Sequence, residues 1–575
     1  MNGMNEMQLY SRWVAQNLED TDLAEELAAV AGDTDAIKDR FFRDLEFGTG
    51  GLRGVIGAGT NRMNIYTVRK ATQGLADYLK ATYPNPSVAV SYDSRIKSDL
   101  FARETASVLA ANGIKVYLYP ELNPTPALSF AVRDLHCQAG VMITASHNPA
   151  KYNGYKAYGP DGCQMTIEAA NAVLDCINRL DIFDDIRTVD FEAALADGWI
   201  AYIGQDTYAR FLENVRAQSI HPEALRQTDL KVVYTPLNGT GNKPVREILR
   251  MTGVKNVVVV KEQELPDGHF TTCPYPNPEI KEALQKGLEL CAVEKPDLLL
   301  ATDPDCDRVG IAVPDQDGNY VLITGNEVGA LLFEYICRER IAAGTMPERP
   351  VAVKTIVTTE IVQKMADEYG VELRNVLTGF KFIGEQIGYL EEAGEANRYI
   401  FGFEESYGYL AGTYVRDKDA VVASMLICEM AAFYRLKGIS LLDALHAIYR
   451  KYGIYLHSQK SFTCEGVTGM ERMAAIMQEL RENPPQAIGG LRVLTISDYM
   501  LRRTTQVDTG NVSAITLPQS DVIGFALEQD ASVIIRPSGT EPKIKAYYTA
   551  TAEKMDHAKE IQQRLQEDFA KILGF

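Results

Sequence analysis

The stretch GVMITASHNP, residues 140–149, passes from an apolar run of strand length directly into a polar loop. The same change occurs in DLLLATDPDCDR, residues 297–308, and in RYIFGFEES, residues 398–406. Before each of these stretches, apolar runs alternate with amphipathic runs of helix length, which indicates βαβ units and a parallel sheet. The sequence therefore predicts three β-α-β-α-β units, each closing on a strand that leads into a polar loop.

In the first unit, strands are predicted at 87–93 and 115–120 and helices at 98–111 and 126–135. After residue 457, SVIIRPSGTEPKIKAYYTA predicts a strand, a loop and a strand, followed by a long C-terminal helix. The fold class is therefore α/β, with three related domains around a cleft and a smaller C-terminal α+β domain. The expected boundaries are 1–206, including an N-terminal extension, 207–325, 326–456 and 457–575.

The chain has 575 residues and a formal net charge of −19, with acidic and basic residues interspersed. This length exceeds what one hydrophobic core supports, which agrees with several domains. The negative field disfavours nucleic acid or an anionic membrane as the main partner. An anionic small ligand would need a local set of basic contacts.

The N-terminus lacks a basic region followed by an apolar one, so no signal peptide is expected. The longest apolar run, residues 420–428, is about half of what a membrane span requires and predicts a buried helix. The nine cysteines lie far apart and form no C-x-x-C pair, which suggests reduced thiols. These features together predict a cytoplasmic location.

TDPDCDR places Asp303, Asp305 and Asp307 at alternate positions, which lie on one side of an extended backbone. Converging carboxylates repel one another unless a cation lies between them, and oxygen ligands suit Mg²⁺ or Ca²⁺. The alternative is a solvated acidic turn begun by Asp-Pro. An EF-hand is excluded, because Arg308 and Pro314 stand where that loop needs glycine and glutamate.

Three further stretches contain residues that could bind phosphate groups or sugar hydroxyls. RPSGTEPKIK, residues 536–545, combines basic residues, hydroxyls and a glycine, a set that suits a phosphate group or an ordinary turn. FEESYG, residues 403–408, offers carboxylates for sugar hydroxyls, although an exposed acidic loop would look the same. The glycine-rich stretch 47–64 is a weak signal that favours turns over a phosphate cradle.

Ser146 follows the strand of the opening stretch, where a serine is commonly a helix cap or a turn hydroxyl. A serine-hydrolase elbow is excluded, because TASHN lacks both glycines of G-x-S-x-G. Neighbours on an extended chain point to opposite faces, so His147 is not expected to deprotonate Ser146 directly. The remaining chemical alternative is phosphoryl transfer, with the hydroxyl as phosphate carrier and a metal that neutralises charge.

TASHNP, DPDCDR, EES and RPSGTEPK, in this order, resemble the α-D-phosphohexomutase family, and within it the phosphoglucomutases of a long branch that includes phosphopentomutases. The resemblance spans about residues 47–545. It implies three related α/β domains and a smaller fourth around a deep cleft. It further implies an isomerase, an intramolecular phosphotransferase that interconverts glucose 1-phosphate and glucose 6-phosphate.

The resemblance implies that Ser146 carries the transferable phosphate and that one Mg²⁺ is held by Ser146, Asp303, Asp305 and Asp307. Lys156 is then the candidate for proton transfer, and His147, Arg53 and Arg308 complete the reacting centre. The implied substrate-binding residues are Arg95, Thr378, Gly379, Glu404, Ser406, Lys418, Arg536, Ser538, Gly539, Thr540 and Lys543.

The implied reaction passes phosphate from Ser146 to a sugar phosphate, which gives glucose 1,6-bisphosphate as intermediate and activator. The bisphosphate then reorients and returns its other phosphate. The implied partner is a small sugar phosphate. Phosphopentomutase or phosphomannomutase activity, a metal-dependent phosphatase and a silent sugar-phosphate binding protein are the alternatives.

Overall fold

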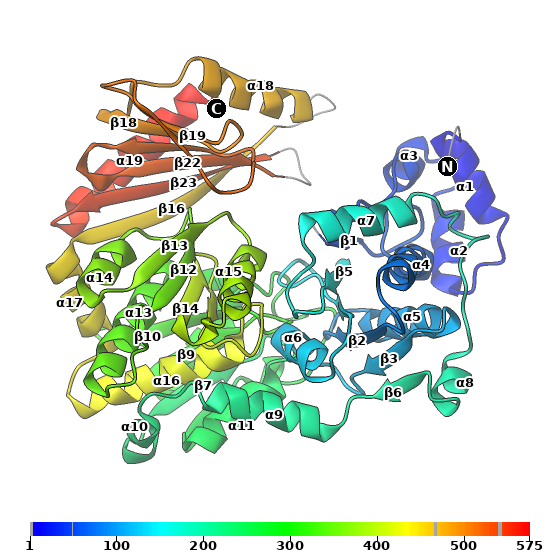
Figure 1. Ribbon diagram of the computed structural model, residues 1–575, viewed down its shortest axis with the longest axis horizontal. Helices are drawn as coiled ribbons and strands as arrows, with labels where there is room; N and C mark the ends of the chain where they lie inside the picture. The colour runs from blue at the N-terminus through cyan, green and yellow to red at the C-terminus, as the bar shows by residue number, and fades with distance from the viewer. Residues whose placement is uncertain (1–3, 49, 465–468, 539–542) are drawn as a thin grey trace. The chain divides into compact units, whose positions relative to one another are not determined.

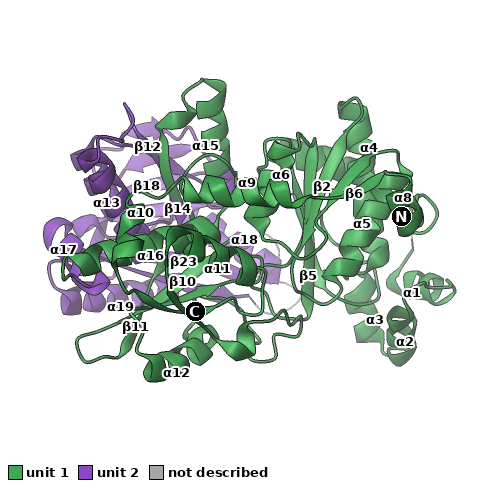
Figure 2. Ribbon diagram, turned by 90° about the horizontal axis from the view of Figure 1, so that it is seen from below, with its two compact units in different colours: residues 1–325, 383–402, 406–438 green, residues 326–382, 403–405, 439–575 purple. Residues whose placement is uncertain are grey.

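The computed structural model describes residues 4–48, 50–464, 469–538 and 543–575 (Figure 1). By contacts within the chain, these residues form two compact units (Figure 2). Unit 1 comprises Met1–Gly325, Ile383–Gly402 and Ser406–Gly438, and unit 2 comprises Asn326–Phe382, Phe403–Glu405 and Ile439–Phe575. Within the described ranges, no helix combines the length and the apolar character needed to cross a membrane.

The first sheet of unit 1 has six strands in the order β1-β5-β4-β2-β3-β6. Strands β4, β2, β3 and β6 run parallel, whereas β5 and β1 are antiparallel to their neighbours. All five residues of β4 are buried, as expected for an interior strand. The strands are β1 Gly51–Val55, β2 Ser87–Tyr92, β3 Lys115–Leu118, β4 Ala139–Ile143, β5 Tyr152–Tyr158 and β6 Ile200–Tyr202.

Helices flank this sheet, and α5 matches the predicted helix at both ends. The polar loop that contains Ser146 begins at the carboxyl end of β4, where ligands bind in open α/β sheets. The helices are α4 Ile65–Thr82, α5 Ser98–Ala111, α6 Thr125–Asp134, α7 Ile167–Ile177, α8 Phe191–Ala196 and α9 Gln205–Arg216.

The second sheet, also in unit 1, has the order β11-β10-β9-β7-β8. Strands β9, β7 and β8 are parallel, and β10 and β11 extend the sheet as an antiparallel pair that sequence patterning did not predict. The metal loop, residues 303–308, connects β9 to β10. The elements are α10 Pro222–Gln227, β7 Lys231–Thr235, α11 Asn242–Thr252, β8 Asn256–Val259, α12 Gln285–Glu294, β9 Leu298–Thr302, β10 Val309–Pro314 and β11 Tyr320–Ile323.

The third region again alternates strands and helices, and β12 pairs with β13 in parallel. The apolar run 420–428 lies in α16, and its side chains there are buried, which confirms the prediction of a buried helix. The elements are α13 Gly325–Ala342, β12 Val351–Thr355, α14 Ile361–Tyr369, β13 Glu372–Val376, α15 Phe380–Glu392, β14 Tyr399–Glu404, β15 Gly408–Leu410, α16 Ala420–Leu436 and α17 Leu441–Tyr452.

The C-terminal region of unit 2 forms an antiparallel sheet in the order β16-β23-β22-β21-β18-β19-β20, with β17 paired to β18. The predicted strand–loop–strand is confirmed as β22 and β23, and the long final helix as α19. The elements are β16 Ile454–Thr463, α18 Gly469–Glu482, β17 Ala487–Ile488, β18 Leu491–Asp498, β19 Arg503–Gln506, β20 Val512–Ala514, β21 Ile523–Leu527, β22 Ser532–Pro537, β23 Lys543–Ala552 and α19 Met555–Ile572.

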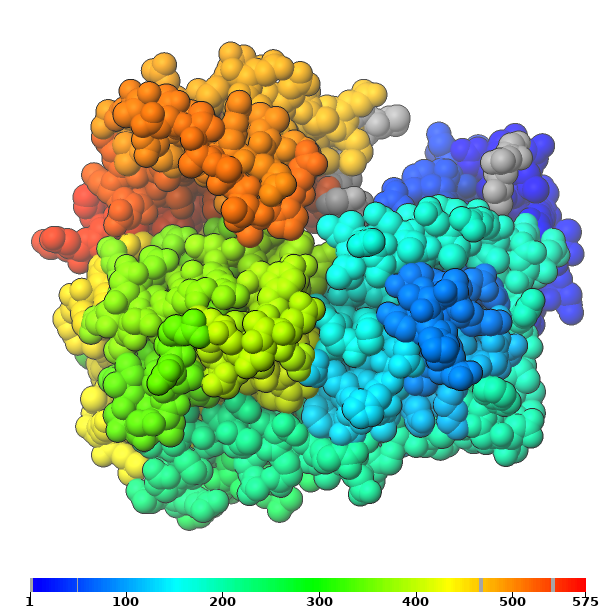
Figure 3. Space-filling view, viewed as in Figure 1, coloured from blue at the N-terminus to red at the C-terminus, as the bar shows by residue number. Residues whose placement is uncertain are grey.

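The N-terminal extension folds into α1 Glu6–Val14, α2 Thr21–Ala29 and α3 Thr34–Phe41. Trp13 is 1% exposed and meets the rings of Tyr66 and Phe183 edge-on, at centroid distances of 5.5 and 5.2 Å. These helices share one hydrophobic core with the first sheet, and Figure 3 shows them in dark blue against the surface of the same unit. The extension is therefore an integral part of the first domain.

The N-terminal extension packs against part of the glycine-rich stretch. Glu26 of α2 accepts a hydrogen bond from the Ala58 amide at 2.8 Å, and Asn61 donates to the Arg40 carbonyl at 3.0 Å. Gly59 has a φ of +125°, and a Cβ there would lie 2.6 Å from the Arg40 carbonyl oxygen. This part of the stretch contacts α2 and α3, in agreement with the prediction that it forms turns rather than a phosphate cradle.

We expect Gly59→Ala to lower the free energy of unfolding by about 2–4 kcal/mol, because the positive φ and the clash with backbone add together. Gly113→Ala is the matched control, since φ there is +72° and nothing lies within 4 Å of a Cβ; its expected cost is about 1 kcal/mol. Denaturant unfolding followed by the fluorescence of the two tryptophans, the buried Trp13 and the exposed Trp199, measures both. Equal costs for the two variants would contradict the proposed close approach.

Candidate active site

Ser146 lies in the loop that follows β4 and is 4% exposed. Its φ is +52°, in the left-handed region, and its amide donates to the Thr144 hydroxyl at 2.8 Å. The Ser146 hydroxyl donates to Oδ2 of Asp303 at 3.0 Å. A hydroxyl from one domain and a carboxylate from the next thus meet in a buried place.

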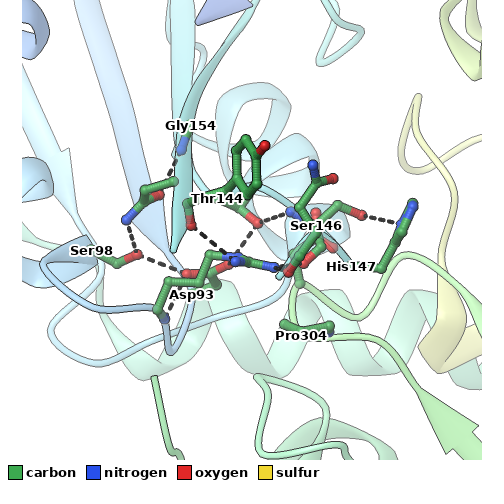
Figure 4. A network of polar contacts seen from close by, with 12 residues as sticks. Asp93, Ser98, Thr144, Ser146, His147, Gly154 and Pro304 are labelled. Atoms are coloured by element: carbon green, nitrogen blue, oxygen red, sulfur yellow. Dashed lines mark hydrogen bonds and ion pairs between the residues drawn. The ribbon is translucent and has the colours of Figure 1, made fainter. Parts of the chain in front are cut away.

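His147 lies closer to this hydroxyl than the sequence suggested. Its Nδ1 is 3.3 Å from the Ser146 Oγ (Figure 4). The expectation that the two side chains point to opposite faces is wrong, because it assumed an extended backbone and Ser146 is left-handed. Burial, followed by the charges of Arg308 and Arg53, lowers the pKa of His147 well below its usual value, so the ring is neutral near pH 7.

Arg95 and Asp93 hold the backbone of the loop around Ser146. Arg95 donates to the carbonyls of Ser146, Asn148, Pro149 and Tyr152, and its Nε lies 3.3 Å from Oδ2 of Asp93. Asp93 also accepts from the hydroxyls of Thr144, at 2.6 Å, and Ser98, at 2.8 Å (Figure 4). Arg95, named above as substrate-binding, also lies over the ring of Phe270, 5.1 Å from its centroid. Its substrate role stays a prediction.

The three aspartates of the metal loop are buried, with exposed fractions of 0% for Asp303 and Asp305 and 1% for Asp307. One oxygen from each lies within 4.8 Å of the others. The Oδ1 atoms of Asp305 and Asp307 are buried and have no hydrogen-bond partner among the described residues. Buried carboxylate oxygens without donors are costly unless a cation meets them, so this donor set fits a divalent ion that prefers oxygen.

The pKa shifts within the loop also fit a site for a divalent cation. Burial, together with the neighbouring carboxylates of Asp305 and Asp307, raises the pKa of Asp303 well above its usual value. Burial would also raise the pKa of Asp305, but the ammonium of Lys156 outweighs it and brings that pKa below the usual value. The ionised carboxylates of this loop therefore need nearby cations to stabilise them.

Two lysines supply positive charge beside the loop. Lys156 of β5 lies 2.9 Å from Oδ2 of Asp305 and 3.6 Å from Oδ2 of Asp307. Lys418 lies 3.1 Å from Oδ2 of Asp307 and 2.9 Å from Oδ1 of Asp417. Burial alone would lower the pKa of Lys156, but the carboxylates of Asp305 and Asp307 hold it above the usual value.

Arg53 and Arg308 lie at the edge of this group. Arg53 extends from β1, and its Nη1 donates to the side chain of Asn148 at 3.2 Å. Arg308 donates to Glu279 at 2.7 Å, and its Nε lies 3.7 Å from Oδ1 of Asp307. Unit 1 thus brings together all the residues predicted for the reacting centre.

Sequence reasoning missed three contributors. Tyr158 donates to Oδ2 of Asp417 at 2.8 Å, and Asp417 in turn holds Lys418. Thr125, at the start of α6, donates to Asp305. The only sequence signal for Asp417 is its place beside Lys418 in VRDKD, and Thr125 has none, because its partner is 180 residues away.

Unit 2 holds most of the residues predicted for the sugar and those predicted for the second phosphate. Gly379, with a φ of +119°, donates its amide to Oε1 of Glu404 at 3.0 Å, which joins two of the predicted sugar-binding residues. Thr378 precedes this glycine and is half-buried. Ser406 is half-buried and belongs to unit 1.

The predicted phosphate loop joins β22 to β23. The Arg536 guanidinium lies against the hydroxyl of Tyr547, at 3.1 and 3.2 Å, and Ser538 donates its amide to the carbonyl of Lys543 at 2.8 Å. Gly539 and Thr540 lie outside the described residues. The basic residues at both ends of the loop are therefore placed on neighbouring strands.

Four family models match the chain in order. They are domains I, II and III of phosphoglucomutase/phosphomannomutase, described as alpha/beta/alpha, and the C-terminal domain of the same family. The matched residues are 44–182, 206–318, 324–452 and 519–567. The three related α/β domains and the distinct fourth domain predicted from the sequence are confirmed, while the boundaries proposed for them stay predictions.

Curated relatives cover most of the chain. A phosphoglucomutase of Staphylococcus aureus (strain bovine RF122 / ET3-1) is 39% identical over 525 residues, which is 90% of this chain and 92% of the relative. A phosphoglucomutase of Staphylococcus haemolyticus (strain JCSC1435) is 36% identical over 524 residues, covering 90% and 93%.

Solved structures share the fold. Parafusin from Paramecium, described as a phosphoglucomutase in an open form, matches with a TM-score of 0.69 and 17% identity over 92% of this chain and 96% of the other. A family protein from Burkholderia thailandensis matches with a TM-score of 0.66 and 18% identity over 92% and 96%. From the four domain matches and the curated relatives, the chain belongs to the phosphoglucomutase/phosphomannomutase family, the α-D-phosphohexomutases.

Proposed function

We propose that the chain is a mutase that interconverts glucose 1-phosphate and glucose 6-phosphate through a phosphoserine at Ser146. The observation that carries this proposal is the 3.0 Å hydrogen bond between the Ser146 hydroxyl and Asp303 of a buried three-carboxylate loop. The curated relatives named phosphoglucomutase support the choice of glucose. A serine without an acyl-transfer triad but beside a cation site suits phosphoryl transfer.

We propose Mg²⁺, one per chain, as the cation, held by Asp303, Asp305, Asp307 and an oxygen at Ser146. The donor set consists of oxygens only and leaves positions for other ligands, as working Mg²⁺ sites do. When bound, Mg²⁺ neutralises charge that develops on the transferring phosphoryl group.

The chain's own residues serve the transfer in the following way. The sugar hydroxyl oxygen forms a bond to phosphorus while the bond from Ser146 Oγ to phosphorus breaks. The hydroxyl loses one proton and Ser146 gains one, so the step is balanced. Lys156, which Asp305 and Asp307 hold as an ammonium, is the proposed carrier of the proton that the departing Ser146 oxygen takes up.

His147 and the arginines have supporting roles in this proposal. The neutral His147 ring lies beside Oγ and orients it, and Arg53 and Arg308 supply positive charge for the phosphoryl oxygens. Lys418 is proposed to bind the substrate near Asp307. The frame of Asp93 and Arg95 keeps the loop in one conformation, so that little reorganisation accompanies transfer.

The residues that recognise the rest of the substrate are proposed from the family pattern. Glu404 and Ser406 would accept hydrogen bonds from sugar hydroxyls, and Thr378 and Gly379 would contact the sugar. The second phosphate would be bound by Arg536, Ser538, Gly539, Thr540 and Lys543. Glucose 1,6-bisphosphate is then the intermediate and activator, because both ends of the sugar must take each position in turn.

We expect glucose 1-phosphate to be turned over with a kcat/KM at least about tenfold above those of mannose 1-phosphate and ribose 1-phosphate, because the sugar loop reads hydroxyl positions. Coupled assays with the three sugar phosphates at equal concentrations measure this. Inorganic phosphate is followed in the same samples. Equal or better turnover of ribose 1-phosphate, or phosphate release without isomerisation, would contradict the proposed activity.

We further propose a cytoplasmic location and a small sugar phosphate, rather than nucleic acid or a membrane, as partner. The nine cysteines, all within the described residues, form no disulfide, which supports a reducing compartment. The net charge of −19 supports the exclusion of polyanions.

A further inference from the structure

Thr125, which was not among the predicted site residues, forms hydrogen bonds directly to the metal loop. Thr125 is fully buried, and its hydroxyl donates to Oδ2 of Asp305 at 2.9 Å. Its backbone amide donates to the carbonyl of the same aspartate, also at 2.9 Å. Asp305 is therefore bound by Thr125 through both its side chain and its backbone.

The local sequence explains why Thr125 has an amide to offer. It is the first residue of α6, after Pro124 at the N-cap position. Amides in the first turn of a helix have no partner within the helix, so this one is available to another segment. The hydroxyl points the same way, and both bonds converge on one residue of a loop 180 positions away.

The bonds divide the two oxygens of Asp305. Thr125 and Lys156 both donate to Oδ2, at 2.9 Å each, whereas Oδ1 is buried and has no hydrogen-bond partner in the part of the chain that the structure describes. With Oδ2 fixed, rotation of the carboxylate is restricted, and Oδ1 is the oxygen left for a cation. Hydrogen bonds to the outer oxygen of a ligand orient it in this way in metal sites.

Thr125 also relates two parts of the chain. Helix α6 and strand β4, which leads to Ser146, belong to the first domain, whereas Asp305 belongs to the second. At the neighbouring residue of the metal loop, Thr240 donates its amide and its hydroxyl to the carbonyl of Pro304, at 2.8 and 3.0 Å. A threonine of each domain thus bonds to the loop.

We propose that Thr125 is a positioning residue for the divalent cation: its hydroxyl fixes Asp305 so that the carboxylates of the second domain are in register with Ser146 of the first. This inference rests on the proposed metal-dependent function. It differs from a merely structural role, in which the hydroxyl only satisfies a buried oxygen and its loss would lower stability without changing metal affinity.

The test is Mn²⁺ binding to the full-length protein, measured by the electron paramagnetic resonance signal of the free ion. Thr125→Val keeps the backbone amide and removes the hydroxyl, and we expect it to weaken Mn²⁺ binding about 10- to 100-fold. Thr105→Val is the matched control, because that buried hydroxyl donates only to the Phe101 carbonyl within α5. We expect wild-type affinity from Thr105→Val.

A second pair guards against a folding defect in Thr125→Val. Thr125→Ser and Thr125→Ala differ only in the hydroxyl, and we expect the serine variant to bind Mn²⁺ at least about tenfold more tightly than the alanine variant. Equal affinities across wild type, Thr125→Val and Thr125→Ala would overturn the role of Thr125 alone. A wild-type protein that binds no Mn²⁺ saturably would instead overturn the proposed metal site, and the role of Thr125 with it.

Discussion

Ser146→Ala is expected to lower kcat by at least about 10⁴-fold, because no other oxygen can carry the phosphate between the two positions of the sugar. The assay is the conversion of glucose 1-phosphate to glucose 6-phosphate with Mg²⁺ and glucose 1,6-bisphosphate present. The fold should be unchanged, since the hydroxyl is one small polar group in a loop held mainly by Arg95 and Thr144.

The control for this variant is Ser91→Ala in β2 of the same sheet. Ser91 is also buried, and its hydroxyl donates to the carbonyl of Asn123 at 3.1 Å rather than to a residue of the metal loop. We expect near wild-type turnover from Ser91→Ala and an unfolding transition for Ser146→Ala close to that of wild type. Turnover by Ser146→Ala within a few-fold of wild type would show that another residue carries the phosphate.

Removal of divalent metal has the second-largest expected effect. Chelation should lower turnover by about 10³-fold or more, because three buried carboxylates would then face an anionic phosphoryl group with only lysine and arginine charges between them. Addition of Mg²⁺ in excess of the chelator should restore turnover. Ca²⁺, which prefers longer bonds and a larger coordination number, should restore much less.

The same experiment separates a catalytic from a structural metal. If the cation only stabilised the fold, chelation would lower the unfolding transition together with turnover. Slow refolding would then accompany the recovery of activity when metal is added back. We expect turnover to fall while the secondary structure, measured by circular dichroism, stays the same. Full activity in the chelated protein would contradict the metal-dependent mechanism.

Much of the fold was predictable from the sequence, because the period of apolar residues reports burial directly. The helix at 98–111 matches α5 at both ends, and the strands that precede TASHNP and TDPDCDR match β4 and β9 closely. The antiparallel strands were less visible. Strands β5, β10 and β11 are antiparallel additions, and their positions depend on pairing with partners that the local pattern does not identify.

The sequence also indicated which polar loops the structure brings together, but not the contacts within them. The order of the polar loops identified Ser146 and the three aspartates, since each loop follows a buried strand. The contact between Ser146 and His147 depends on a left-handed backbone at Ser146. A local bond to Thr144 and a tertiary bond from Arg95 hold Ser146 in this conformation. Thr125 and Asp417 could not be found, because their significance comes from partners far away in the sequence or on another strand.

The measurement that tests the central claim most directly is mass spectrometry of the protein after incubation with glucose 1,6-bisphosphate and Mg²⁺. The proposed mechanism predicts the mass of one added phosphoryl group, located by peptide sequencing on Ser146, and its loss to added glucose 6-phosphate or glucose 1-phosphate. Ser146→Ala should take up none. Phosphate on a different residue, or rapid mutase turnover by a protein that never carries phosphate on Ser146, would contradict the account.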